Sequence, residues 1–162
     1  AFTWFVLNAF GNFLGAGIWG FFHTLPQVNL YTHGTQFTSA HGHLAFFGAY
    51  ATILIGMMYI AVQGKNSIKV MNNTTSTIFA TSMITGGVLG MTVALTVAGY
   101  VDVLVTRAQM GATWAGYFDG QSGAWFAQGM DWRLIMGVVT FTGFFFLIKD
   151  LLTIGKSTNH VR

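Results

Sequence analysis

Two histidines in an apolar stretch are the residues of this chain best suited to chemistry. His41 and His43 are separated by Gly42 and lie about five and seven residues into a hydrophobic run. Ionisable groups inside a membrane span are costly, and they tend to mark ligand sites, relays or ion pathways. The structural alternative is a neutral histidine that hydrogen-bonds to a neighbouring helix.

The spacing of the pair limits what it can bind. Residues i and i+2 of an α-helix lie about 200° apart, so His41 and His43 are expected to point to opposite sides and not to share one metal ion. A zinc-binding pair on one helix face would be spaced i, i+4. Haem iron accepts a neutral imidazole as axial ligand, so two haems flanking the helix are compatible with the spacing.

The other three histidines carry weaker signals. His23 and His33 precede the pair, and His160 stands in the polar C-terminal tail, where a solvated histidine is the simplest interpretation. His33 lies in a polar stretch, and loops commonly expose histidine.

The charges show which elements must hold these histidines. The first Lys, Arg, Asp or Glu of the chain is Lys65. One membrane helix needs about 20 apolar residues, so the stretch before Lys65 is long enough for two. We expect four spans in all, at about 2–21, 37–62, 76–105 and 125–150. The expected connections are 26–39, 63–75 and 107–123.

Small residues indicate where these spans meet. Gly11 and Gly15, and likewise Gly86 and Gly90, are spaced four residues apart. Small residues at this spacing let helix backbones approach closely in membranes, so both pairs predict helix–helix contacts.

Composition assigns the chain to the membrane proteins. Only 7% of its 162 residues are charged, 53% are hydrophobic, and the mean hydropathy is +0.58. A soluble domain carries roughly 25% charged residues, so disorder is excluded and a soluble domain is disfavoured. The absence of Cys rules out disulfides and thiolate sites. The net charge of +3 comes from too few groups to argue for nucleic acid. We predict an all-α integral membrane fold forming one transmembrane region, 1–162.

The basic residues predict an orientation. Five of the seven follow the second and fourth spans, namely Lys65, Lys69, Lys149, Lys156 and Arg162. The other two, Arg107 and Arg133, flank the opposite ends of the spans. Cytoplasmic loops carry an excess of Lys and Arg, so both termini of the chain are expected to be cytoplasmic.

Several long and unusual segments carry a family resemblance. They read GAGIWGFFHTLP at 15–26, YTHGTQ at 31–36, AHGHLAFFGAY at 40–50 and GMTVALTVAG at 90–99. They closely resemble the catalytic subunit of bacterial nitric oxide reductases, within the haem–copper oxidase superfamily. The resemblance covers essentially the whole chain, as the last four helices of a twelve-helix bundle. It implies a segment of a longer, multi-pass subunit in the bacterial cytoplasmic (inner) membrane.

The resemblance implies roles for individual residues. In this family the first histidine of the H-x-H pair ligates the high-spin haem of the active site, which corresponds to His41. The second ligates the low-spin, electron-transfer haem, which corresponds to His43. His33 resembles a position near the high-spin haem propionates, and Thr24 resembles a residue near the active-site pocket.

The activity implied by the resemblance is the reduction of two NO molecules to nitrous oxide and water, a respiratory reaction of denitrification. It uses two b-type haems, one high-spin and one low-spin, and a non-haem iron. The family's iron ligands and its functional glutamates come from earlier helices, and this sequence contains no Glu. The chain is therefore expected to bind the N-terminal helices of its subunit. A cytochrome c-type subunit or quinol would donate the electrons.

Three alternatives remain open at this point. An oxygen-reducing haem–copper oxidase would share the H-x-H helix but use copper as its second metal. A non-catalytic dihaem electron-transfer protein would share the pair of ligands and lack the second metal. A structural four-helix membrane protein would bind neither haem.

Overall fold

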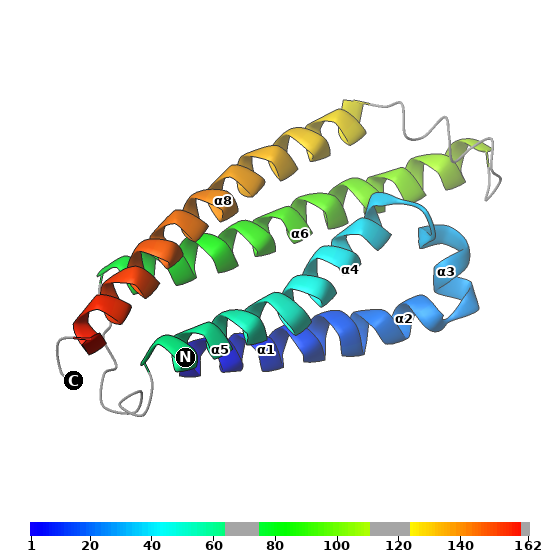
Figure 1. The fold of residues 1–162 in the computed structure, drawn as a ribbon. Helices are drawn as coiled ribbons and strands as arrows, with labels where there is room; N and C mark the ends of the chain where they lie inside the picture. Colours follow the sequence, from blue (N-terminus) through cyan, green and yellow to red (C-terminus); the bar gives the residue numbers. More distant parts are fainter. Residues whose placement is uncertain (64–74, 111–123, 160–162) are drawn as a thin grey trace.

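The structure, a computed structural model, describes residues 1–63, 75–110 and 124–159, which form four long helical segments (Figure 1). We call these spans one to four. Span one is α1 (Phe2–Gly11), the π-helical η1 (Asn12–Trp19) and α2 (Gly20–Thr24). Span two is α4 (Gln36–Phe46), the π-helical η2 (Phe47–Ala51) and α5 (Thr52–Gln63). Spans three and four are α6 (Thr75–Met110) and α8 (Ala124–Asn159).

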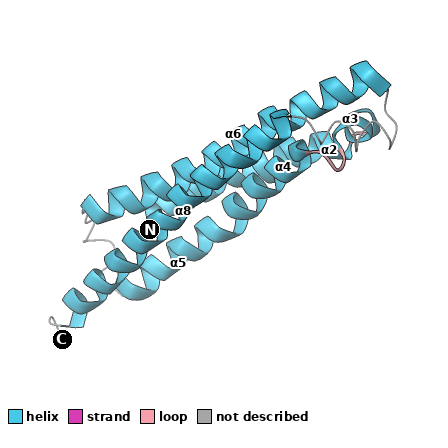
Figure 2. Ribbon diagram, turned by 90° about the horizontal axis from the view of Figure 1, so that it is seen from above, coloured by secondary structure: helices cyan, strands magenta, loops and turns pink. Residues whose placement is uncertain are grey.

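Each span contains a stretch long and apolar enough to cross a membrane. The four stretches are Phe2–Thr24, Gln36–Val62, Thr75–Leu104 and Met130–Gly155. The spans extend along a common direction in two perpendicular views (Figure 1; Figure 2). The predicted all-α membrane fold with four spans is therefore confirmed.

Span one packs on span two, and α6 packs on α8 and on α4. The apolar core lies toward the end of the bundle where the N-terminus and the end of α8 are found (Figure 1). It draws on every span, through Trp4, Ile55, Tyr59, Ala80, Ile84, Leu147, Leu151 and Ile154. A polar cluster sits beside this core, where Tyr59 and Thr77 donate hydrogen bonds to Oδ2 of the buried Asp150 at 2.6 and 2.8 Å.

The prediction of a loop at 26–39 is wrong for most of these residues. Residues Pro26–Thr32 form a short helix, α3, whose first turn contains the proline. Proline suits this position because its missing N–H would have no helical partner there. The chain leaves helical structure only around 33–35, and α4 begins at Gln36.

Two helices continue beyond the expected ends of their spans. Span three is helical through Met110, so the backbone at Arg107 is helical, while its membrane-crossing stretch ends at Leu104, close to the expected 105. Span four is helical to Asn159, and its membrane-crossing stretch ends at Gly155, past the expected 150. Asp150 does not end the helix because its carboxylate is buried and hydrogen-bonded by two other spans. The predicted turn at 63–75 and connection at 107–123 otherwise fall largely outside the described residues.

The glycine pairs meet neighbouring helices at three of the four predicted positions. A Cβ on Gly11 would collide with Gly48 Cα, and one on Gly15 would lie 2.9 Å from Ala45 N. A Cβ on Gly90 would lie 2.6 Å from Met136 Sδ. Gly86 is the exception, because a Cβ there would meet nothing within 4 Å.

Candidate functional site

The helix that carries the histidine pair has a well-defined start. Gly34 adopts a φ of 76°, a conformation that glycine tolerates without steric cost. The next residue, Thr35, caps α4: its hydroxyl accepts a hydrogen bond from Phe37 N at 3.2 Å and donates one to Thr32 O at 2.7 Å. Threonine is favoured at this position because it satisfies an otherwise free backbone N–H. This cap, six residues before His41, fixes where α4 begins.

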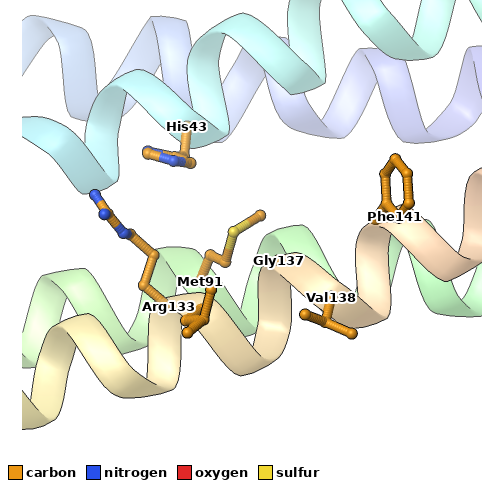
Figure 3. A pocket seen from close by; sticks show the side chains of 7 residues that line it. His43, Met91, Arg133, Gly137, Val138 and Phe141 are labelled. Atoms are coloured by element: carbon orange, nitrogen blue, oxygen red, sulfur yellow. The ribbon is translucent and has the colours of Figure 1, made fainter.

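His43 faces α6 and α8. It lines an open groove of about 370 Å³ (Figure 3). The other lining residues are Met91, Arg133, Leu134, Gly137, Val138 and Phe141. The groove is mostly apolar, and the exposed side chain of Arg133 brings a positive charge to it.

The His43 ring is oriented by its own helix. Its Nδ1 lies 2.8 Å from the carbonyl oxygen of Ser39. In the tautomer in which Nδ1–H donates to that carbonyl, Nε2 keeps its lone pair and can bind a metal. Metal-ligating histidines are commonly fixed in this way by a hydrogen bond from the other ring nitrogen.

His41 faces span one, away from the groove. Its ring stacks on His23, with centroids 4.8 Å apart and an interplanar angle of 21°, and lies 6.3 Å from Trp19. A Cβ on Gly20 would lie 3.5 Å from His41 Cε1, and the carbonyl of Gly15 is near enough to interact with the ring. The two imidazoles thus contact different neighbours on opposite sides of α4, as their i, i+2 spacing predicts.

Among the described residues, two ring nitrogens on the His41 side have no hydrogen-bond partner. They are His41 Nδ1 and His23 Nε2, and both are buried. His23 Nδ1 is occupied, since it lies 3.2 Å from Trp19 O. Buried polar atoms in native proteins nearly always have a partner, so a missing one calls for an explanation.

The two remaining candidate residues, His33 and Thr24, make hydrogen bonds to nearby residues of the chain. His33 is exposed just after α3, where its backbone N–H donates to Asn29 O at 2.9 Å. Thr24 is also exposed, and its hydroxyl donates to Phe21 O at 2.7 Å, within its own helical segment. His160 lies outside the described residues. Within those described residues, no cluster of three or more His, Cys, Asp or Glu side chains could hold a metal ion.

Sequence reasoning missed three residues around the pair. Arg133 enters the prediction only as a charge that flanks span four, although a charge inside an apolar window is itself a signal of a site. Met91 lines the groove from α6, and His23 stacks on His41 from span one. Met91 gives no signal in the sequence and His23 only a weak one, because each reaches the histidine pair only through the packing of one span on another.

Comparisons with known proteins agree with the all-helical membrane fold. Residues 1–148 match the family described as cytochrome c and quinol oxidase polypeptide I. The chain is also similar to a nitric oxide reductase subunit of Stutzerimonas stutzeri, with 40% identity over 107 residues. Those residues are 64% of this chain and 23% of that protein, so the chain spans about a quarter of its relative's length.

Proposed function

Because the chain belongs to the family of cytochrome c and quinol oxidase polypeptide I, the haem–copper oxidases, we propose that it is the haem-binding, C-terminal part of a membrane nitric oxide reductase. The observation that carries the proposal is the direction of the two imidazoles, to opposite sides of α4. The similarity to a nitric oxide reductase subunit supports nitric oxide reduction as the reaction within the family.

The groove at His43 fits a low-spin b-type haem. A flat apolar macrocycle matches a wall that includes Leu134, Val138 and Phe141. His43 Nε2 supplies a neutral imidazole ligand, held in place through Nδ1. Arg133 supplies a cation that can pair with a carboxylate such as a haem propionate. A haem bound here supplies one-electron transfer through its iron.

The opposite side of α4 fits the axial ligation of a high-spin, gas-binding haem by His41. The carbonyl of Gly15 is near enough to interact with the His41 ring, and such a contact can orient a metal-ligating imidazole. Gly20 keeps side-chain bulk away from the His41 ring. His41 is the residue to which we assign a catalytic role, since it would hold the haem at which NO reacts.

One rigid helix carrying both ligands is the contribution this chain makes to the reaction. The proposed reaction converts two NO, two electrons and two protons into nitrous oxide and water. His41 and His43, two residues apart, would fix the separation and mutual orientation of the donor and acceptor sites. Electron transfer between the sites then needs no movement of the protein.

The family resemblance supplies further roles, which we include in the proposal. His33 would lie near the high-spin haem propionates and Thr24 near the active-site pocket. A non-haem iron, the second ligand of the low-spin haem and the remaining N-terminal helices would come from outside this segment. Electrons would arrive from a cytochrome c-type subunit or from quinol, and the segment would lie in the bacterial cytoplasmic membrane with both ends inside.

Absorption spectra of the purified whole complex test the proposal. We expect a reduced-minus-oxidised spectrum with a low-spin haem and a CO-difference spectrum from a high-spin haem. We also expect NO consumption to exceed O₂ consumption by the same sample. Faster O₂ consumption would favour an oxygen reductase, the activity that the oxidases in the family's description suggest. Two low-spin haems without gas binding, or no haem, would contradict the proposal.

A further inference from the structure

Span two changes its helical winding directly after the histidine pair. The α-helix that holds His41 and His43 ends at Phe46, and the next five residues, Phe47–Ala51, are π-helical. A π-helix closes its hydrogen bonds from i to i+5, so it places an extra residue in the turn. Each residue corresponds to about 100° of rotation around an α-helix axis. The direction of the histidines relative to the other half of span two therefore depends on this segment.

An asparagine of span one reaches into the π-helical segment. Asn8 Nδ2 lies 2.8 Å from the carbonyl oxygen of Gly48 and 2.7 Å from that of Ala49. It also lies 3.3 Å from Thr52 Oγ1, whose hydroxyl donates to Gly48 O at 2.6 Å. Irregular winding disturbs the usual backbone hydrogen bonds of a helix, and a carbonyl without a partner is costly inside a membrane. The Asn8 amide supplies hydrogen bonds to two carbonyl groups of this segment.

Close contact between the backbones of spans one and two brings the Asn8 side chain within reach of the π-helical segment. A Cβ on Gly11 would collide with Gly48 Cα, and a Cβ on Gly15 would lie 3.0 Å from Leu44 C. The two spans therefore touch along their backbones, from the π-helical segment to the residue next to His43. Small residues at such contacts let short polar side chains hydrogen-bond between helices.

The half of span two beyond the π-helical segment is anchored separately. Ile55 and Tyr59 belong to the buried core, and the Tyr59 hydroxyl donates to Asp150 at 2.6 Å. If the π-helical segment changed to α-helical winding while this half stayed fixed, α4 would have to rotate about the helix axis. The side chains of His41 and His43 would then change direction.

We propose that Asn8 is a positioning residue for the haem-ligating pair, and that it acts by holding the π-helical segment Phe47–Ala51 in its present winding. This inference rests on the proposed function, since it takes His41 and His43 to be haem ligands. Asn8 touches neither histidine and has no part in the chemistry.

The test compares two asparagines of span one in the whole purified complex. Asn8→Leu removes the amide at similar side-chain size. Asn12→Leu is the matched control, because Asn12 Nδ2 bonds to Asn8 O at 3.1 Å within the same span. The readouts are haem content, the electron paramagnetic resonance g values of the low-spin haem, which depend on imidazole orientation, and NO turnover.

We expect Asn8→Leu to retain haem, to shift the low-spin g values and to lower turnover by about tenfold, since small errors of position are costly to rate. Asn12→Leu should match the wild-type complex in all three. Thr52→Val provides a second, milder variant in case Asn8→Leu fails to assemble. It should shift the g values in the same direction, and its effect should not add to that of Asn8→Leu.

The outcomes separate the inference from the proposed function. Wild-type g values in both Asn8→Leu and Thr52→Val, in a haem-containing complex, would overturn the positioning role alone. An equal shift in Asn12→Leu would also overturn it, because the effect would then belong to span one in general. A wild-type complex that holds no haem would contradict the proposed function and, with it, the inference.

Discussion

At the scale of single residues, the hydrogen bonds of the rings matter as much as their spacing. The Ser39 carbonyl binds Nδ1 of His43 and leaves Nε2 directed away from that bond. His41 stacks on His23 and has a buried nitrogen that no described residue hydrogen-bonds. The opposite directions of the pair could be predicted from the helical period alone. The stack could not be predicted in this way, because His23 belongs to another span.

Arg133 provides a prediction about the groove at His43 (Figure 3). A nearby cation favours the reduced form of a haem, because reduction adds negative charge. Arg133→Gln should therefore lower the midpoint potential of the low-spin haem, by an amount on the order of tens of millivolts. Potentiometric titration followed by absorption measures the potential.

Lys149→Gln is the matched control for Arg133→Gln. Lys149 lies on the same helix but lines a different surface hollow, with Phe145, Ile148, Leu152 and Thr153. Its substitution should leave the potential unchanged. An equal shift in both variants, or none in Arg133→Gln, would mean that Arg133 does not act on the haem.

At the scale of elements, hydropathy predicted how many spans there are, and local chemistry decided where they end. Pro26 looked like the start of a loop, yet it begins α3, because proline is accepted in the first turn of a helix. Asp150 looked like a helix end, yet two hydroxyl groups from other spans satisfy it. The π-helical segments η1 and η2 have no hydrophobic period that would have identified them.

The polar cluster at Asp150 provides a prediction about how the spans hold together. Tyr59→Phe removes the donor of a 2.6 Å hydrogen bond to a buried carboxylate. Leaving such a group under-satisfied costs about 1–3 kcal/mol, so the complex should melt at a lower temperature. The haem spectra should not change, because the cluster packs beside the core and not against the histidine pair.

Tyr50→Phe is the control for Tyr59→Phe, since Tyr50 is 63% exposed and lies on the same span. The melting temperature of each variant is measured from the loss of helical circular dichroism on heating. A melting temperature equal to that of the wild type in Tyr59→Phe would show that the bond does not stabilise the bundle.

At the scale of the whole molecule, much of the apolar surface of the four spans is open. Phe10, Phe13, Phe141 and Phe145 are each more than 60% exposed. Lipid or further helices can cover such a surface, and the chain spans 23% of its reductase relative. Its membrane character was predictable from composition, whereas the neighbours that complete the site cannot be read from these 162 residues.

Topology provides a prediction about how the bundle lies in the membrane. The distribution of Lys and Arg predicts that the end of span four lies in the cytoplasm. A reporter enzyme fused after Lys156 should therefore lie in the cytoplasm. A reporter inserted near Gly120 should lie outside the cytoplasmic membrane. Paired phosphatase and β-galactosidase fusions distinguish the two sides, and the reverse pattern would overturn the proposed orientation.

The central claim is that His41 and His43 ligate two different haems, and difference spectra of single substitutions in the whole complex test it most directly. His160→Ala serves as the control, and membrane assembly of each variant is established first. His41→Ala should lose the high-spin, CO-binding signal and NO turnover, with the low-spin spectrum kept. His43→Ala should lose the low-spin signal and electron entry, while CO still binds. Loss of the same spectral component in both variants would contradict the claim, because the two histidines would then serve one site.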